Sequence, residues 1–352
     1  MRSFRIAMVI AMFAVLFQGC ASVNREPDLT SPGLHRTSVQ RAAVEMPAEQ
    51  AERIAVWAVP FSRVAGHVYC RYLSDTDLAA AKKSEDCNEF PGASDTGWRQ
   101  LYDWQTALKD DEKKTGLELM AFGRAESGSR GVIVIGFKGT DFSSLSDWRS
   151  NLRWFTRILP LPGQDQYQVV HSRAGELVDL ALSRAKEVFP SVQEYDVYST
   201  GHSLGGGLAQ LLAYSDFRVK GAVVFDPSPV TGYATLVTDR QVNCSARIVR
   251  IYERGEALQY VRSFLRLFYT LSPNINEFSF NLIHSKGNPV ANHSMSAFRS
   301  GLEARAKVAK TQALPVGDLP GDPDCKCYRE RRPEYRAPDA AACQASTGTV
   351  GR

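Results

Sequence analysis

Several patterns are missing from this sequence, and each absence excludes a class of protein. Neither a His-Glu-x-x-His segment nor a pair of Cys-x-x-Cys segments occurs, so we expect no metal centre and no cofactor. An excess of one charge is also lacking, because 42 Lys and Arg oppose 38 Asp and Glu, and a net charge of +4 is too small to indicate a nucleic-acid partner. No internal repeat is evident. What remains is the composition of a globular protein, with 44% hydrophobic residues over 352 positions, enough to bury a sizeable core.

The apolar run at the N-terminus is short. It covers Ile6 to Phe17 and follows two arginines, which predicts a removed secretory signal over residues 1–19, because twelve residues cannot span a bilayer as a helix. Cys20 after Gly19 resembles the lipidated cysteine of bacterial lipoproteins. Ala21 after it favours, by resemblance, the outer membrane and periplasm over the inner membrane; cleavage after Ala21 by an ordinary signal peptidase is the alternative. We therefore expect a lipid anchor at Cys20 that binds the protein to an envelope membrane, with its oligomeric state open.

The remainder of the chain divides into three parts by composition. Residues 20–47 contain scattered prolines and no periodicity, which predicts a tether. Residues 48–312 form the expected domain, and residues 313–352 form a tail rich in cysteine and proline. Six further cysteines in an oxidising compartment permit up to three disulfide bonds, whose pairing is open. They are Cys70, Cys87, Cys244, Cys325, Cys327 and Cys343.

Strand and helix patterns alternate within the expected domain. The apolar runs Leu117 to Gly123 and Val132 to Phe137, joined by a Gly/Ser-containing turn, predict a β-hairpin. A helical pattern starts at Ala48, and Pro60 predicts a kink or a break in it. The alternation predicts an α/β fold, with a mostly parallel central sheet, helices on both faces and an antiparallel hairpin at its start.

One stretch of the domain indicates chemistry. A β-rich run stops at Gly201 and a helical pattern starts after Ser203, inside the sequence Gly-His-Ser-Leu-Gly. A side chain at Gly201 or Gly205 would collide with the tight turn, so the turn presents Ser203 as a nucleophile. An ordinary glycine-rich turn between strand and helix is the alternative for the five residues alone.

A serine hydroxyl needs a base, and the base needs a carboxylate that orients it. The chain order of serine, acid and histidine in hydrolases of this kind favours His293, in a loop before the last helix. His284 ends a strand and is the alternative. Asp226 and Glu256 each follow a strand between Ser203 and the histidine, so position leaves both acids open.

An oxyanion needs preorganised hydrogen-bond donors. The backbone N–H of Leu204, at the helix start, is one candidate. Thr140, in the loop after an early strand, offers both a backbone N–H and a hydroxyl. A simple glycine turn is the alternative interpretation of that loop.

These motifs, in this order, resemble those of the class 3 lipase family. They are Gly-His-Ser-Leu-Gly-Gly at 201–206, Phe-Lys-Gly-Thr at 137–140, Asp147-Trp148, Val170-His171, and Phe225-Asp-Pro-Ser-Pro229, which is similar to Phe-Gly-x-Pro. The resemblance spans about residues 54–310. It implies an α/β-hydrolase fold and hydrolysis of lipid esters by a Ser-Asp-His triad without a cofactor. It also implies a lid at Arg153 to Gln168, for which a core helix or a plain loop is the alternative.

The resemblance favours Glu256 as the acid, because the acid of the family lies in the segment where this chain reads Glu253-Arg-Gly-Glu256. Glutamate in place of aspartate departs from the family. We therefore expect a serine hydrolase of the triacylglycerol lipase or phospholipase type, acting through Ser203, His293 and Glu256, with Asp226 as the alternative acid. A non-catalytic lipid-binding envelope protein with this fold, and a thioesterase or peptidase with the same triad, are the other possibilities.

Overall fold

The computed structural model describes residues 24–37, 42–70, 97–126, 128–139, 165–232, 242–243, 245–256, 258–259, 262, 275–286, 289 and 291–309. The predicted signal segment with Cys20, the oxyanion candidate Thr140, most of the predicted lid, the C-terminal tail and the predicted disulfide bonds lie outside this description.

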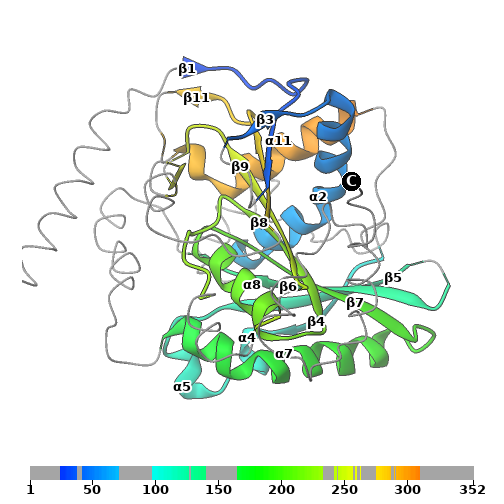
Figure 1. Ribbon diagram of the computed structural model, residues 1–352. Helices are drawn as coiled ribbons and strands as arrows, with labels where there is room; N and C mark the ends of the chain where they lie inside the picture. The colour runs from blue at the N-terminus through cyan, green and yellow to red at the C-terminus, as the bar shows by residue number, and fades with distance from the viewer. Residues whose placement is uncertain are drawn as a thin grey trace, which may run out of the picture.

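A nine-stranded mixed sheet forms the centre of the protein (Figure 1). The strand order is β3-β2-β10-β9-β8-β7-β6-β5-β4. The five strands from β6 to β10 are parallel to one another, and the two strands added at each side of them pair in the antiparallel direction. The strands are β2 (Leu34–Thr37), β3 (Val44–Glu45), β4 (Arg99–Asp103), β5 (Leu119–Ala125), β6 (Arg130–Phe137), β7 (Glu194–His202), β8 (Val219–Phe225), β9 (Arg247–Glu253) and β10 (Ile275–Phe280).

The predicted antiparallel hairpin is confirmed as β5 and β6, which pair from Leu119 opposite Phe137 to Ala125 opposite Gly131. Strand β6 is buried from Gly131 to Phe137, as its nearly continuous apolar sequence predicts for a strand covered on both faces. The mostly parallel central sheet is confirmed as well.

The predicted tether over residues 20–47 is wrong for part of its length. Leu34–Thr37 forms β2, antiparallel to β10, and Val44–Glu45 forms β3 beside it. Asn24–Arg25 (β1) pairs with Ser285–Lys286 (β11) in a separate two-stranded sheet. These strands are two to four residues long, too short for the periodicity that reveals a strand in a sequence.

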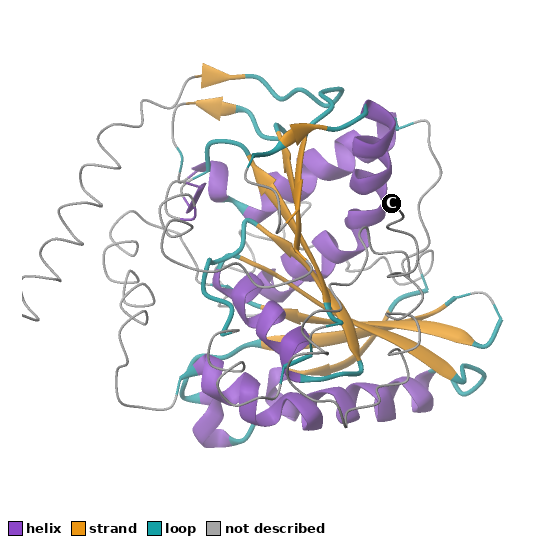
Figure 2. Cartoon of the chain, in the orientation of Figure 1, coloured by secondary structure: helices purple, strands orange, loops and turns teal. Residues whose placement is uncertain are grey.

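Helices cover both faces of the sheet, as predicted (Figures 1 and 2). Helices α2 (Ala48–Cys70) and α11 (Met295–Val308) pack on one face, and α7 (Gln166–Val188) and α8 (Leu204–Ser215) pack on the other. Successive strand residues point to opposite faces, so Val197 joins the core under α7 and α8 while Tyr198 joins the core under α2. Two short helices, α4 (Trp104–Ala107) and α5 (Asp110–Lys113), connect β4 to β5.

Helix α2 continues through Pro60 for 23 residues, so the helix does not break there. Its buried face, which includes Trp57, Phe61 and Val64, packs against the sheet core. Burial of such side chains is worth about 1.5–3 kcal/mol each, which outweighs the hydrogen bond that proline removes.

In the part of the chain that the structure describes, none of the helices has both the length and the apolar character needed to cross a membrane.

The topology brings the candidate site residues to one edge of the sheet. Strands β6, β7, β8 and β9 are parallel, so their carboxyl ends lie together. The segments that follow these ends carry the candidate nucleophile Ser203 and both candidate acids, Asp226 and Glu256. Sites in open α/β sheets form at such an edge.

Candidate active site

Ser203 occupies the turn between β7 and α8 in a strained backbone conformation, with φ 56° and ψ −125°. Residues other than glycine rarely adopt a positive φ, and such strain is typical of functional turns. The Ser203 N–H donates to the carbonyl of Phe225 at 3.1 Å, and its carbonyl accepts the N–H of Ser228 at 2.8 Å. Its hydroxyl is buried and makes no hydrogen bond. The backbone therefore fixes the turn and leaves the hydroxyl available.

The glycines on either side of Ser203 lie so close to neighbouring backbone atoms that a Cβ would clash with them, as the sequence predicts. A Cβ at Gly201 would lie 2.4 Å from the carbonyl of Gly205, and a Cβ at Gly205 would lie 2.2 Å from the carbonyl oxygen of Phe137. A Cβ at Gly206 would lie 2.7 Å from Cβ of Pro227. The steric prediction for the turn is confirmed.

The loop after β6 runs directly against the nucleophile turn. The Gly139 N–H donates to the hydroxyl of Tyr69 at 3.0 Å, and a Cβ at Gly139 would lie 2.5 Å from the carbonyl oxygen of His202. Leu204 is the first residue of α8, where backbone N–H groups lack intrahelical acceptors. Thr140 follows Gly139 in sequence, and the oxyanion roles of Thr140 and Leu204 stay predictions.

His293 and Glu256 form a buried pair. His293 ends a short 3₁₀ helix, η3 (Ala291–His293), immediately before α11, and its Nδ1 lies 2.8 Å from Oε2 of Glu256. Both side chains are at most 3% exposed. By contrast, the alternative base His284 lies at the surface, where its Nδ1 is 2.8 Å from Oε2 of Glu26. The structure thus brings together the histidine and the acid that the sequence favours.

Two further groups hold Glu256. The Leu258 N–H donates to Oε2 at 2.7 Å, and the buried Arg262 donates to Oε1 in an ion pair. Arg262 also donates to the carbonyl of Pro227 at 3.2 Å. Burial by itself would raise the pKa of Glu256, but the charge of Arg262 and the hydrogen bond with His293 bring it below its ordinary value. Glu256 is therefore an ionised carboxylate at neutral pH.

Asp226, at the end of β8, is the other candidate acid and is wholly buried. Its Oδ1 accepts the N–H of Glu253 at 2.9 Å. Burial, and after it the charge of Glu256, raise the pKa of Asp226 well above its ordinary value. Both effects favour the protonated form of Asp226, and Glu256 is the carboxylate that accepts the hydrogen bond from His293.

His202 lies beside the candidate base, with its ring centroid 4.5 Å from that of His293. Burial, followed by the proximity of His293, lowers the pKa of His202 well below its ordinary value, so its ring is neutral. Tyr69, on α2, lies with its hydroxyl 3.2 Å from Nδ1 of His202. The same hydroxyl accepts the Gly139 N–H, so Tyr69 links the loop after β6 to the ring of His202.

Ligand-type atoms of His202, Asp226 and His293 lie within 4.8 Å of one another, a grouping that metal sites also use. In this grouping Nδ1 of His293 is hydrogen-bonded to Glu256, and Nδ1 of His202 lies 3.2 Å from the hydroxyl of Tyr69.

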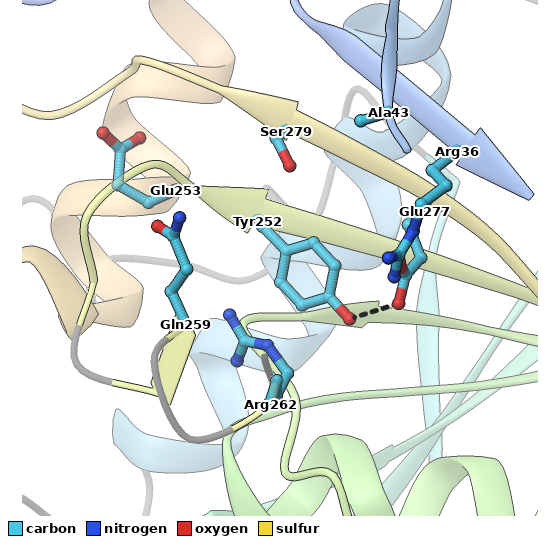
Figure 3. Close-up of a pocket in the computed structure, with 8 residues that line it drawn as sticks. All are labelled: Arg36, Ala43, Tyr252, Glu253, Gln259, Arg262, Glu277 and Ser279. Carbon is cyan, nitrogen blue, oxygen red and sulfur yellow. Dashed lines mark hydrogen bonds and ion pairs between the residues drawn. The ribbon is translucent and has the colours of Figure 1, made fainter. Parts of the chain in front are cut away.

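Arg262 also lines a polar cavity of about 210 Å³ (Figure 3). Its lining includes Glu277, which accepts hydrogen bonds from Tyr252 at 3.1 Å and from Arg250 at 3.3 Å and pairs with Arg36. The guanidinium of Arg262 stacks over the Tyr252 ring at 4.1 Å. Such a charged lining is unsuited to an acyl chain. The lining residues are Arg36, Ala43, Tyr252, Glu253, Gln259, Arg262, Glu277 and Ser279.

The sequence did not reveal Tyr69 or Arg262. Tyr69 contacts His202 across 133 positions of the chain, and Arg262 belongs to no motif that the sequence contains. By contrast, the chain order of serine, acid and histidine was sufficient to predict His293 as the candidate base.

The nucleophile turn belongs to a segment that matches a known family. Residues 134–235, from within β6 to beyond β8, match the sequence model of the lipase (class 3) family. The resemblance to class 3 lipases is therefore confirmed over this segment, and the match supports hydrolysis of a lipid ester. The comparison with curated protein sequences gives no match.

Two solved structures are distantly similar to this chain. Lipase II from Rhizopus niveus is 11% identical, over 67% of this chain and 83% of that one, with a TM-score of 0.38. The crystal structure of ESTFA in its iron-lacking apo form is 10% identical, over 71% and 96%, with a TM-score of 0.33. At these values neither likeness carries a functional argument.

Proposed function

We propose that this protein is a serine hydrolase that cleaves carboxylic esters of lipids through Ser203, His293 and Glu256. The observation that carries the proposal is the buried His293–Glu256 pair, at 2.8 Å, at the sheet edge where the strained turn presents Ser203. A histidine held by a buried carboxylate is the base that a serine nucleophile requires.

In the proposed reaction, His293 removes the proton of Ser203 as the hydroxyl oxygen attacks the ester carbonyl. Glu256 accepts the Nδ1–H of His293 and stabilises the imidazolium that forms. The oxyanion receives hydrogen bonds from Leu204 and Thr140. The imidazolium then gives its proton to the departing alcohol, and water, activated by the same histidine, releases the fatty acid from the acyl-enzyme.

The glutamate that replaces the aspartate of the family is compatible with this role. Its longer side chain is held at both oxygens, by Arg262 at Oε1 and by the Leu258 N–H at Oε2. A carboxylate with these fixed partners can orient His293 as a shorter acid would.

The substrate class that we propose is an acylglycerol or a phospholipid. The test is hydrolysis of p-nitrophenyl esters of increasing chain length, of emulsified triacylglycerol and of phospholipid vesicles by the full chain. We expect the protein to hydrolyse the esters and the Ser203→Ala variant to be inactive. Lipid binding without hydrolysis of any ester would instead indicate a non-catalytic protein, and preference for thioesters or peptides would indicate the other enzyme classes.

We also propose that lipid at Cys20 anchors the protein in the bacterial envelope, at the outer membrane or in the periplasm. The order of Gly19, Cys20 and Ala21 after a short apolar run supports this proposal. Expression with radiolabelled palmitate tests it. Label that is lost in Cys20→Ala, and processing that globomycin blocks, are the expected results; cleavage after Ala21 without label would contradict the anchor.

A further inference from the structure

Two buried carboxyl groups, Asp226 and Glu256, lie close enough to one buried cation, Arg262, for its charge to act on both. Arg262 is 5% exposed, pairs with Oε1 of Glu256 and donates to the carbonyl of Pro227, the residue that follows Asp226. Asp226 and Glu256 are both wholly buried. Burying two carboxylates beside one guanidinium would leave one negative charge without a counter-ion, so a single carboxylate is the stable state.

The second carboxyl group lies within reach of the base. One oxygen of Asp226 is within 4.8 Å of a ring nitrogen of His293 and of His202. Its Oδ1 is used by the Glu253 N–H, but its Oδ2 is buried and makes no hydrogen bond. A buried polar atom without a partner is rare in proteins and calls for an explanation.

The backbone at Asp226 adds a second cost. Its φ is 39°, in the left-handed region that favours glycine. An aspartate at this position therefore costs folding free energy twice, once through backbone strain and once through burial of its carboxyl group. Strain at such sites is often associated with function.

We infer that Asp226 is a reserve carboxylate for the proposed triad, which ionises when Glu256 loses its negative charge and then balances Arg262 and stabilises protonated His293. Its proton passes to solvent. The inference rests on the proposed function. In the unaltered protein Asp226 is neutral and Glu256 carries the charge.

The charges around Asp226 support this exchange. Burial raises the pKa of Asp226, the negative charge of Glu256 raises it further, and Arg262 opposes both. Removing the charge of Glu256 therefore lowers the pKa of Asp226. The titratable and charged groups that face it are His202, Glu253, Glu256, Arg262 and His293.

A double-mutant cycle on the full chain tests the inference. Asp226→Asn keeps the oxygen that accepts the Glu253 N–H, and Glu256→Gln removes the charge of the acid. We expect Asp226→Asn to lower kcat/KM for a p-nitrophenyl ester by less than about threefold alone, but by about tenfold or more in the Glu256→Gln background. The same factor in both backgrounds would overturn the inference. If Glu256→Gln does not fold, Glu256→Ala provides the second background.

Asp196→Asn is the matched control. Asp196 is a buried aspartate near the start of β7, far along the strand from Ser203, and it pairs with Arg130 and Lys220. It should cause no additional loss of kcat/KM in the Glu256→Gln background. In addition, the activity of Glu256→Gln should rise with pH as Asp226 ionises, and this rise should disappear in the double variant.

An infrared measurement separates failure of this inference from failure of the proposed function, because it needs no activity. The unaltered protein should show a protonated-carboxyl band that Asp226→Asn removes and that Glu256→Gln weakens at neutral pH. A band that persists unchanged in Glu256→Gln would refute the reserve carboxylate even if the protein hydrolyses esters. Absence of hydrolysis together with the predicted band changes would refute only the proposed function.

Discussion

The nucleophile turn and the acid–base cluster lie at the same edge of the sheet but are held by different forces. The turn around Ser203 is fixed by backbone contact, since glycines on both sides touch carbonyl groups that leave no room for a Cβ. The cluster of His293, Glu256, Arg262 and Asp226 is fixed by charge and hydrogen bonds between side chains from separate segments. The turn therefore depends on shape, and the cluster depends on charge.

This difference determines how each region responds to change. A packed backbone turn cannot adapt to added volume, because protein interiors are close-packed. A cluster that contains both a protonated and an ionised carboxyl group can change which of the two carries the charge without a change in backbone position. Substitutions that separate steric from electrostatic effects test the distinction.

The largest effect is expected for Ser203→Ala. Loss of the nucleophile should lower kcat by about 10³-fold or more, as in serine hydrolases generally. The melting temperature should not fall, because the hydroxyl makes no hydrogen bond and its loss leaves no partner unsatisfied. Ester hydrolysis and thermal unfolding of the same sample measure both effects. Undiminished hydrolysis would show that the turn does not carry the nucleophile.

The next effect is steric. Gly205→Ala would place a Cβ 2.2 Å from the carbonyl oxygen of Phe137, so the variant should lose about 3 kcal/mol of stability or fail to fold. Gly175→Ala is the matched control, because Gly175 is also helical and its Cβ would lie 3.8 Å from the nearest atom, on Arg218. That control should gain about 0.5–1 kcal/mol. Denaturant unfolding compares the two, and equal stabilities would contradict the steric account of the turn.

A third prediction concerns the cation of the cluster. Arg262→Met should lower kcat/KM about tenfold, with the greatest loss at low pH, since Arg262 holds the pKa of Glu256 down and its removal lets that pKa rise. Arg262→Lys should restore part of the activity. The pH profile of kcat/KM provides the measurement.

Arg36→Met is the control for Arg262, because Arg36 pairs with the buried Glu277 away from His293. Each Met variant removes one ion-pair partner of a buried carboxylate, while Glu277 keeps Arg250 and Glu256 keeps His293, so each should lose at most about 3 kcal/mol of stability. Only Arg262→Met should alter the pH profile. If both variants, or neither, alter it, Arg262 has no particular role in positioning Glu256.

The smallest effect is a dependence of stability on pH. The pKa of Asp226 is raised in the folded state, so the folded protein retains a proton that the unfolded chain releases, and stability falls as pH rises between the two pKa values. Asp226→Asn removes this loss of stability with rising pH. The free energy of unfolding of the variant, relative to that of the unaltered protein, should therefore increase by up to about 1.4 kcal/mol per pH unit above about pH 4. Urea unfolding at pH 5 and pH 7 measures the increase. A constant difference would mean that Asp226 is ionised in the folded state.

Features that depend on neighbouring residues could be predicted from the sequence. The turn at Ser203, the hairpin of β5 and β6 and the helices on both faces follow from local glycine placement and from hydrophobic periodicity. His293 could be predicted from chain order. Glu256 could be chosen over Asp226 only through resemblance, because both residues follow strands.

Features that depend on contacts between distant segments could not be predicted. Arg262 belongs to no sequence motif, and its role depends on its ion pair with Glu256, which only the fold brings together. Whether Asp226 or Glu256 holds the charge depends on burial and on the nearby charge of Arg262, which no local pattern encodes. Strand β2 (Leu34–Thr37) is formed by pairing with β10, far along the chain.

The most direct test of the central claim, that the strained turn presents an activated nucleophile, is labelling of the full chain with a fluorophosphonate and identification of the modified residue by mass spectrometry. We predict a single adduct on Ser203, absent from Ser203→Ala and strongly slowed in His293→Ala. No adduct on the folded protein, or an adduct on another residue that persists in Ser203→Ala, would contradict the claim.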